Sequence, residues 1–152
     1  HIPESLGRCP NLREVSMGHN KLTGRIPETL GRCSNLTTLS LSDNRLSGQL
    51  PECVEKWKNL QKLLLDDNQI NGPLPNSIEK CVNLRQLSIA NNELSGFFPE
   101  GISKCVNLRR LNLSGNNISG MIAEGLACCK LIDHLYLGGN RLAGYEILRK
   151  LT

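Results

Sequence analysis

An asparagine recurs at a fixed interval of 24 residues along this 152-residue chain. When the sequence is compared with itself at that offset, six copies superimpose without a gap: Asn20, Asn44, Asn68, Asn92, Asn116 and Asn140. The apolar residues around each asparagine fall into the same register, as in the stretch Asn35–Lys58. A period of this length is typical of a solenoid, in which each repeat stacks only on its neighbours. We therefore predict one repeat array over residues 1–152.

The repeats divide the chain unevenly. Residues 1–10 form the second half of a repeat, residues 11–130 hold five full repeats of 24 residues, and residues 131–152 form a terminal, degenerate repeat. Ala123 replaces the proline of the sixth element, and in the terminal repeat Glu146 and Ile147 stand where an Ile-Pro pair is expected. Solenoids normally end in capping repeats with a polar outer face, and the pattern contains none at the start. We expect this chain to be a piece of a longer protein.

Composition narrows the classes of function. Two Phe, two Tyr and one Trp are too few for a compact aromatic core, so Leu and Ile must fill the interior. The net charge is +4 with both signs interspersed, and no basic run is interleaved with aromatic residues, which argues against nucleic-acid binding. No apolar run approaches the roughly 20 residues that span a bilayer, so we expect no membrane contact by this stretch. We also expect the chain to be a monomer.

Each repeat begins with an expected strand. Leu36, Leu39 and Leu41 are spaced so that the last two lie on one face of a short extended segment. Its copies should stack as a parallel sheet with strands about 4.8 Å apart. The predicted strands are 14–16, 38–40, 62–64, 86–88, 110–112 and 134–136. Asn44 follows where the chain must turn, and a column of such amides can satisfy backbone groups of its own repeat and the next.

A glycine and a proline mark the second half of each repeat, as Gly48 and Pro51 do. Glycine permits a positive φ and proline fixes φ, so the pair redirects the chain on the outer side. An apolar residue such as Val54 then points back to the interior. The connecting piece has room for only a turn or two of helix.

The repeat LxxLxLxxNxLxGxIPxxLxxC, seen in residues 83–105, resembles the plant-specific class of leucine-rich repeat. That class occurs in ectodomains of receptor-like kinases, in receptor-like proteins and in polygalacturonase inhibitors, and the likeness extends to Gly144. The resemblance implies an α/β fold: a right-handed leucine-rich repeat solenoid with a concave parallel sheet, a short second strand, and 3₁₀ or short-helix segments on the convex side.

Seven cysteines raise the question of disulfides or metal ligands. Five share one repeat position, which Trp57 fills in the third element: Cys9, Cys33, Cys81, Cys105 and Cys129. Thiols stacked in one column do not converge on a metal, and a one-repeat spacing of about 4.8 Å exceeds the roughly 3.5–4.5 Å between Cβ atoms of a relaxed disulfide. We predict seven free thiols, with the column buried. Cys53 lies off the column, as does Cys128, which adjoins Cys129.

Two further patterns have structural and functional interpretations. A basic residue precedes each column position, at Arg8, Arg32, Lys56, Lys80 and Lys104. We interpret this basic stripe as a solvated face, the alternative being a site for an acidic partner. Three sequons make Asn35, Asn112 and Asn117 candidate glycan acceptors if the protein is secreted. The repeat consensus also produces such triplets by chance.

No catalytic or cofactor-binding pattern stands out. The three histidines are far apart in the repeat order, and no Gly-rich phosphate loop follows a strand. We expect neither an enzyme nor a bound cofactor or metal. Specificity should then come from variable positions on the concave strands.

Most variable positions on these strands are small and polar, and Leu64 and Tyr136 are exceptions, which we expect to be exposed anchors at strand centres. Asp43, Asp66 and Asp67 should form an acidic patch beside Leu64, partly offset by Lys62. The predicted ligand-binding residues are Asp43, Lys62, Leu64, Asp66, Asp67, Gln86, Arg110, His134 and Tyr136.

Three hypotheses follow for function. The first is part of a plant receptor ectodomain, extracellular or at the cell surface, that binds a peptide or protein ligand and possibly a co-receptor. The second is an inhibitor similar to the polygalacturonase inhibitors. The third is an intracellular or structural scaffold. The column of single cysteines favours the receptor hypothesis over the inhibitor.

Overall fold

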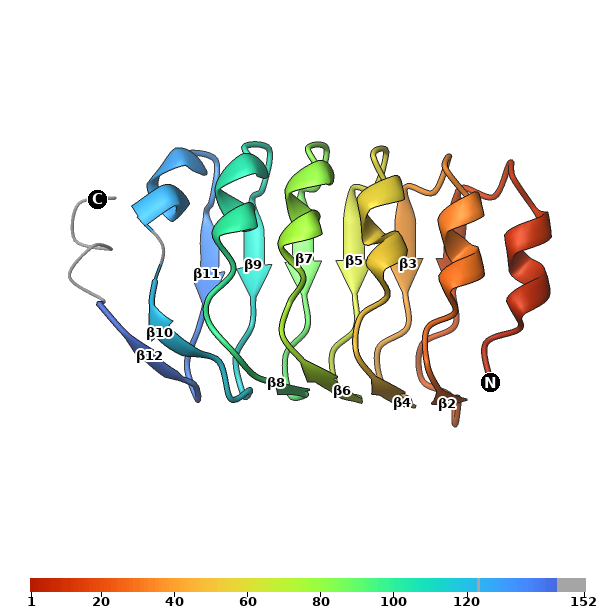
Figure 1. The fold of residues 1–152 in the computed structure, drawn as a ribbon, viewed down its shortest axis with the longest axis horizontal. Coiled ribbons are helices and arrows are strands. Elements are labelled where there is room, and N and C mark those ends of the chain that lie inside the picture. The colour runs from red at the N-terminus through yellow and green to blue at the C-terminus, as the bar shows by residue number, and fades with distance from the viewer. Residues whose placement is uncertain (123, 145–152) are drawn as a thin grey trace.

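The computed structural model describes residues 1–122 and 124–144. Each 24-residue repeat forms one coil of a solenoid and contributes one strand to a six-stranded parallel sheet of order β1-β3-β5-β7-β9-β11 (Figure 1). These strands are β1 (Glu14–Ser16), β3 (Thr38–Ser40), β5 (Lys62–Leu64), β7 (Gln86–Ser88), β9 (Arg110–Asn112) and β11 (His134–Tyr136). The six strands predicted from the leucine spacing are confirmed.

Shorter strands form at the point where each coil turns outward. A four-stranded parallel sheet contains β2 (Thr23–Gly24), β4 (Arg45–Gly48), β6 (Gln69–Gly72) and β8 (Glu93–Leu94). Beside it β10 (Ser119–Met121) pairs with β12 (Arg141–Ala143). A single bridge from Phe97 to Ser119 links the two groups. Glycine is required here because φ is positive at every copy, for example 78° at Gly48.

A 3₁₀ helix of five residues faces the main sheet in each coil, and these helices form one row in front of it (Figure 1). They are η1 (Glu4–Arg8), η2 (Glu28–Arg32), η3 (Glu52–Lys56), η4 (Asn76–Lys80), η5 (Glu100–Lys104) and η6 (Glu124–Cys128). Proline directly precedes the first five, with φ of −74° for Pro99 and −66° for Pro75, because its ring fixes the dihedral at which the helix begins. Ala123, Glu146 and Ile147 lie outside the described residues.

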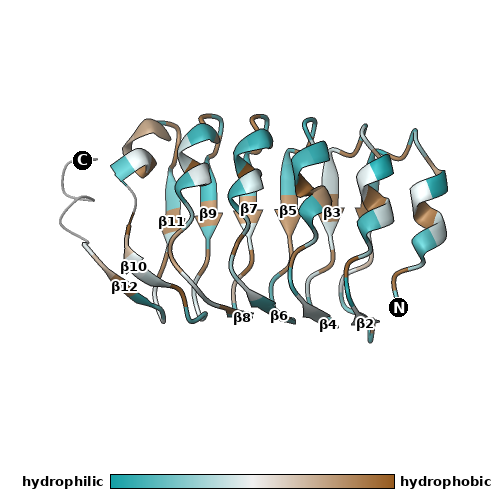
Figure 2. Ribbon diagram, viewed as in Figure 1, coloured by the Kyte–Doolittle hydropathy of each residue, from teal (hydrophilic) through white to brown (hydrophobic). Residues whose placement is uncertain are grey.

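The core runs along the solenoid between the strands and the 3₁₀ helices. The middle residue of each strand points inward, and Leu39, Leu63 and Leu87 are completely buried. Leu30 and Ile78 close the core from the helical side. Figure 2 shows hydrophobic and hydrophilic residues within each helix and strand, as expected when one side of every element is buried.

The repeating asparagines form a hydrogen-bonded ladder, here called the asparagine ladder. Asn68 Nδ2 donates to the backbone oxygens of Leu65 and Asp66 in its own coil, both at 3.2 Å. It also donates to Leu41 O of the preceding coil at 3.1 Å, and its Oδ1 accepts from Leu46 N at 2.9 Å. Equivalent bonds to the preceding coil occur at Asn44, Asn92, Asn116 and Asn140.

The expectation that these amides reach the next coil was wrong: they reach the preceding one. Backbone hydrogen bonds already join each coil to the next one, since Asp43 N donates to Asp66 O and Asp67 N donates to Ala90 O, each at 2.9 Å. The groups left without backbone partners therefore lie on the side of the preceding coil, and the side-chain amide pairs with them.

The cysteine column supplies a second set of bonds between coils. Cys33 Sγ donates to Leu6 O at 3.4 Å, and Cys129 Sγ donates to Ile102 O at 3.3 Å. Trp57 takes the same place in its coil, with its indole Nε1 donating to Leu30 O at 3.1 Å. The position thus requires an apolar side chain that carries one donor. Cys9 is exposed, contrary to the expected burial of the whole column, because no described coil covers it.

All seven cysteines are free in the structure, and their environments differ sharply. Burial raises the pKa of Cys81 and of Cys105 to about 12, while Cys9 and Cys128 are exposed. Burial, followed by the nearby Glu28 carboxylate, raises the pKa of Cys53 to about 12 as well.

Two of the seven thiols should therefore react quickly with a disulfide reagent at pH 8. The thiolate is the reacting form, so the five buried thiols should react only as the protein unfolds. A colorimetric thiol titration of the native and the denatured protein, with mass mapping of the labelled peptides, measures this. Fast labelling of Cys105, or fewer than seven thiols after unfolding without reductant, would contradict the assignment.

Candidate functional site

The register of the main sheet brings four predicted site residues into one row. Lys62 pairs with Gln86, Gln86 with Arg110, and Arg110 with His134, each as the first residue of its strand. Lys62, Arg110 and His134 are exposed and Gln86 is half-buried. We call these four residues the basic row, since it presents two permanent cations and a histidine on neighbouring strands of the concave sheet.

The two expected anchors do not lie together. Leu64 and Tyr136 are the last residues of β5 and β11, with β7 and β9 between them, so three strand spacings of about 4.8 Å separate them by about 14 Å. They are not at strand centres as predicted, because the central residues point into the core. Leu64 is also half-buried and not exposed, whereas Tyr136 is 48% exposed. Tyr136 is therefore the more accessible anchor.

The acidic patch is partly used by the scaffold itself. Asp66 Oδ1 accepts a hydrogen bond from Ser88 Oγ at 2.7 Å and another from Ala90 N at 2.6 Å, and Asp66 is half-buried. Its carboxylate thereby fixes the next coil. Asp43 and Asp67 remain exposed at the strand exits. Lys62 and Arg110 thus stand at strand starts, and the exposed carboxylates of Asp43 and Asp67 stand at strand exits. Glu14, at the start of β1, is an exposed carboxylate at the N-terminal end of the sheet.

The residue just before each ladder asparagine adopts a left-handed backbone, which sequence analysis did not predict. The values of φ are 56° at His19, 57° at Asp43, 55° at Asp67 and 52° at Asn91. Glycine takes the same position at Gly115 and Gly139. Asn, Asp and Gly tolerate this region best, so the restricted composition of the position was the available signal.

The side chains of these residues also contact one another between coils. His19 Nδ1 contacts Asp43 Oδ2 at 3.0 Å, and Asn91 Nδ2 donates to Asp67 Oδ1 at 2.9 Å.

His134 and Tyr136 form a small cluster at the C-terminal end of the sheet. Their ring centroids are 6.3 Å apart, and His134 Nδ1 lies 2.6 Å from Asp133 Oδ1. The hydrogen bond from His134 lowers the pKa of the exposed Asp133 carboxyl group. Asp133 is a further polar residue at this end that sequence analysis did not select.

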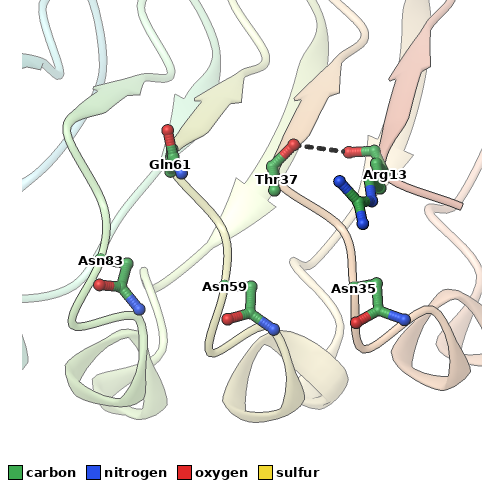
Figure 3. Close-up of a pocket in the computed structure, with 6 residues that line it drawn as sticks. All are labelled: Arg13, Asn35, Thr37, Asn59, Gln61 and Asn83. Carbon is green, nitrogen blue, oxygen red and sulfur yellow. Dashed lines mark hydrogen bonds between the residues drawn. The ribbon is translucent and has the colours of Figure 1, made fainter. Parts of the chain in front are cut away.

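A second polar surface borders the strand starts, as Figure 3 shows. It is a groove of about 360 Å³ lined by Arg13, Asn35, Thr37, Asn59, Gln61 and Asn83. The asparagines follow η2, η3 and η4, and their Nδ2 atoms donate to backbone oxygens of the preceding coil, for example Asn83 to Lys58 O at 2.8 Å. From the sequence, these asparagines were used to mark the start of each repeat, and Asn35 was also a candidate glycan acceptor; their regular recurrence further indicated a structural role.

The three sequons occupy different surfaces. Asn35 lines the groove of Figure 3 and is exposed, and Asn117 is exposed before β10. Asn112 is half-buried on the concave sheet, where its Oδ1 accepts from Ser114 Oγ at 2.7 Å. A glycan on Asn112 would therefore stand on the candidate binding face. Glycosylation of each site stays a prediction.

The described residues contain no group of three or more His, Cys, Asp or Glu side chains placed to hold a metal ion. Within the same part of the chain, no helix has the length and apolar character needed to cross a membrane.

The stacked strands, the asparagine ladder and the short 3₁₀ helices together define a leucine-rich solenoid with a right-handed superhelix and a concave parallel sheet. The Leucine rich repeat family profile matches residues 10–70 and 82–142. The chain belongs to the leucine-rich repeat family, and its repeats are of the plant receptor type. No curated protein sequence matches it.

Several solved plant receptors are similar to this chain. The Arabidopsis receptor kinase HAESA, in complex with the peptide hormone IDA and the co-receptor SERK1, is 36% identical with a TM-score of 0.91, over 96% of this chain and 25% of that one. The plant peptide hormone receptor RGFR1, in complex with RGF2, is 34% identical with a TM-score of 0.91, over 93% and 23%. The ectodomain of the Arabidopsis thaliana receptor kinase SOBIR1 is 29% identical with a TM-score of 0.78, over 86% and 72%.

This chain thus spans about a quarter of the length of the two hormone receptors. The matched chains are ligand-binding or receptor ectodomains, not catalytic domains.

Proposed function

We propose that this chain is part of an extracellular plant receptor ectodomain and binds an extended peptide or protein segment across its concave sheet. A co-receptor is a further proposed partner. The observation that supports the proposal most is the basic row, in which polar side chains of Lys62, Gln86, Arg110 and His134 stand on four neighbouring strands. The similar receptors that were solved with peptide hormones support the same class of ligand.

The charge distribution suggests how the ligand would lie. Lys62 and Arg110 start β5 and β9, and the exposed Asp43 and Asp67 lie at strand exits. This arrangement favours a segment with an acidic side toward the basic row and a basic side toward the exits. Tyr136 offers an amphipathic ring at the C-terminal end, and residues of this kind contribute strongly to binding energy. Ser40, the last residue of β3, is small and half-buried and leaves room for a ligand backbone beside Leu64.

A displayed library of random 12-residue peptides, selected on the native chain, would test this proposal. Peptides that bind the wild type should lose at least tenfold in affinity for the double variant Lys62→Ala/Arg110→Ala, because both cations face the ligand. Tyr136→Ala should have a similar effect, since truncating an interface anchor commonly costs about 2 kcal/mol or more. Affinities are measured by biolayer interferometry.

The matched control is Arg45→Ala/Arg141→Ala, which removes two exposed cations from the first positions of β4 and β12, outside the main sheet. Its affinity should stay within about twofold of the wild type. If the control variant loses as much affinity as Lys62→Ala/Arg110→Ala, attraction to overall positive charge explains binding, and the concave sheet is not the site.

A further inference from the structure

A groove on the flank of the solenoid lies apart from the basic row of the concave sheet. It occurs where η3, η4 and η5 end and the chain passes to the next strand, and its volume is about 530 Å³. The lining residues are Lys58, Asn59, Glu79, Lys80, Val82, Asn83 and Lys104. We call it the flank groove. It shares Asn59 and Asn83 with the groove of Figure 3, so the two surfaces are continuous.

Aliphatic side chains are exposed in the middle of this flank. Val82 is 46% exposed and Val106 is 50% exposed, and they occupy the same position in consecutive coils. Lysine occupies that position in the coils before and after them, at Lys58 and Lys130. Two neighbouring exposed valines surrounded by lysines resemble a small binding interface, in which an apolar centre has a polar rim.

The rim is cationic. Lys80 Nζ contacts Glu79 Oε1 at 3.2 Å, so this lysine is partly neutralised. Lys58 and Lys104 are exposed and form no ion pair with any other described residue. The groove thus presents two unpaired ammonium groups beside an aliphatic surface, which favours a partner with carboxylates next to an apolar side chain.

The asparagines add groups suited to a peptide backbone. Asn59 Nδ2 donates to Ser34 O at 3.0 Å and Asn83 Nδ2 donates to Lys58 O at 2.8 Å. These bonds fix the orientation of each amide and leave its second N–H and its carbonyl oxygen for a ligand. A side-chain amide held in this way offers the same donor and acceptor pair as a peptide unit. Binding to a fixed group also loses less conformational entropy.

We propose that the flank groove binds an acidic, extended peptide segment that carries an aliphatic side chain. The aliphatic side chain covers Val82 and Val106, the carboxylates face Lys58 and Lys104, and the peptide backbone pairs with Asn59 and Asn83. A carboxylated polysaccharide could supply the negative charges, but it has no aliphatic side chain to cover the valines, so the structure favours a peptide. This inference is independent of the proposed concave site.

The probe is a fluorescein-labelled peptide of sequence Glu-Glu-Leu-Leu-Glu-Glu, with binding followed by fluorescence anisotropy. It should bind at least fivefold more tightly than Glu-Glu-Ser-Ser-Glu-Glu, because only leucine covers the valines. The double variant Lys58→Ser/Lys104→Ser should lower the affinity of the leucine peptide at least tenfold. The control Lys21→Ser/Arg45→Ser makes the same change in net charge at exposed positions, just before β2 and at the start of β4. It should leave the affinity within twofold of the wild type.

Val82→Ser should reduce the affinity of the leucine peptide to that of the serine peptide. Met121→Ser, at another exposed apolar residue, should leave the affinity of the leucine peptide unchanged. The proposal is overturned if the two charge variants weaken binding equally, or if the leucine and serine peptides bind alike. Equal competition by hyaluronate, at the same carboxylate concentration as the peptide, would also overturn it by showing that charge alone is recognised.

Discussion

Replacing Asn68 with alanine should lower the free energy of unfolding by roughly 1–3 kcal/mol. Asn68 is nearly buried, and its amide pairs with Leu46 N, Leu41 O and two backbone oxygens of its own coil. The alanine variant leaves the buried Leu46 N–H unpaired, and a buried backbone group without a partner costs roughly 1–3 kcal/mol. Leu41 O loses one of two side-chain donors and keeps the other, Asn44 Nδ2 at 3.0 Å. Urea unfolding followed by circular dichroism measures the change.

The matched control is Asn76→Ala, because Asn76 is exposed and its side chain forms no hydrogen bond to the described residues. Its effect should stay within about 0.5 kcal/mol. Asn68→Asp is a second informative variant: it keeps an acceptor for Leu46 N but removes the donors to the carbonyl oxygens, so it should also be strongly destabilising. An Asn68→Ala variant no less stable than Asn76→Ala would mean that the ladder does not hold the coils together.

Trp57→Ala should be at least as damaging, with a loss of roughly 3–5 kcal/mol. Trp57 is completely buried and stands where the other coils have cysteine, so its removal leaves a large cavity at the centre of the array. The same change also removes the indole N–H that pairs with Leu30 O. Because each coil is stabilised by its neighbours, the loss should extend to the coils on either side.

Two further variants separate packing from hydrogen bonding. Trp57→Phe keeps most of the apolar volume and removes the indole donor, so it should cost less than Trp57→Ala. Leu30 O then keeps only the hydrogen bond from Cys33 N. Trp57→Cys restores a donor but not the volume. Val106→Ala, at an exposed aliphatic residue, is the control and should cost little. Equal effects of Val106→Ala and Trp57→Ala would show that the Trp57 side chain is not part of the core.

The repeat predicted the scaffold well because solenoid geometry is local. Leu39 and Leu41 are both completely buried, as their spacing predicted, since alternate residues of an extended segment face the same side. The glycine and proline positions were equally informative. Gly48 has positive φ and Pro51 directly precedes η3, and both outcomes follow from properties of single residues.

The candidate site was less predictable. The sequence indicated that Lys62, Gln86, Arg110 and His134 share one repeat position, and stacking of the coils then placed them in a row. It did not indicate that the Asp66 carboxylate bonds to Ser88 and Ala90, because both partners belong to another coil. Leu64, expected to be exposed, is half-buried.

By itself, the sequence determined the period, the strands, the glycine turns and the identity of the ladder residues, since each depends on the conformational preference or burial of residues within one repeat. The direction of the ladder toward the preceding coil and the flank groove around Val82 depend on contacts between coils. These contacts join residues 22 to 27 positions apart, as between Asn68 and Leu46 or Leu41, and only the packed solenoid decides which of their atoms meet.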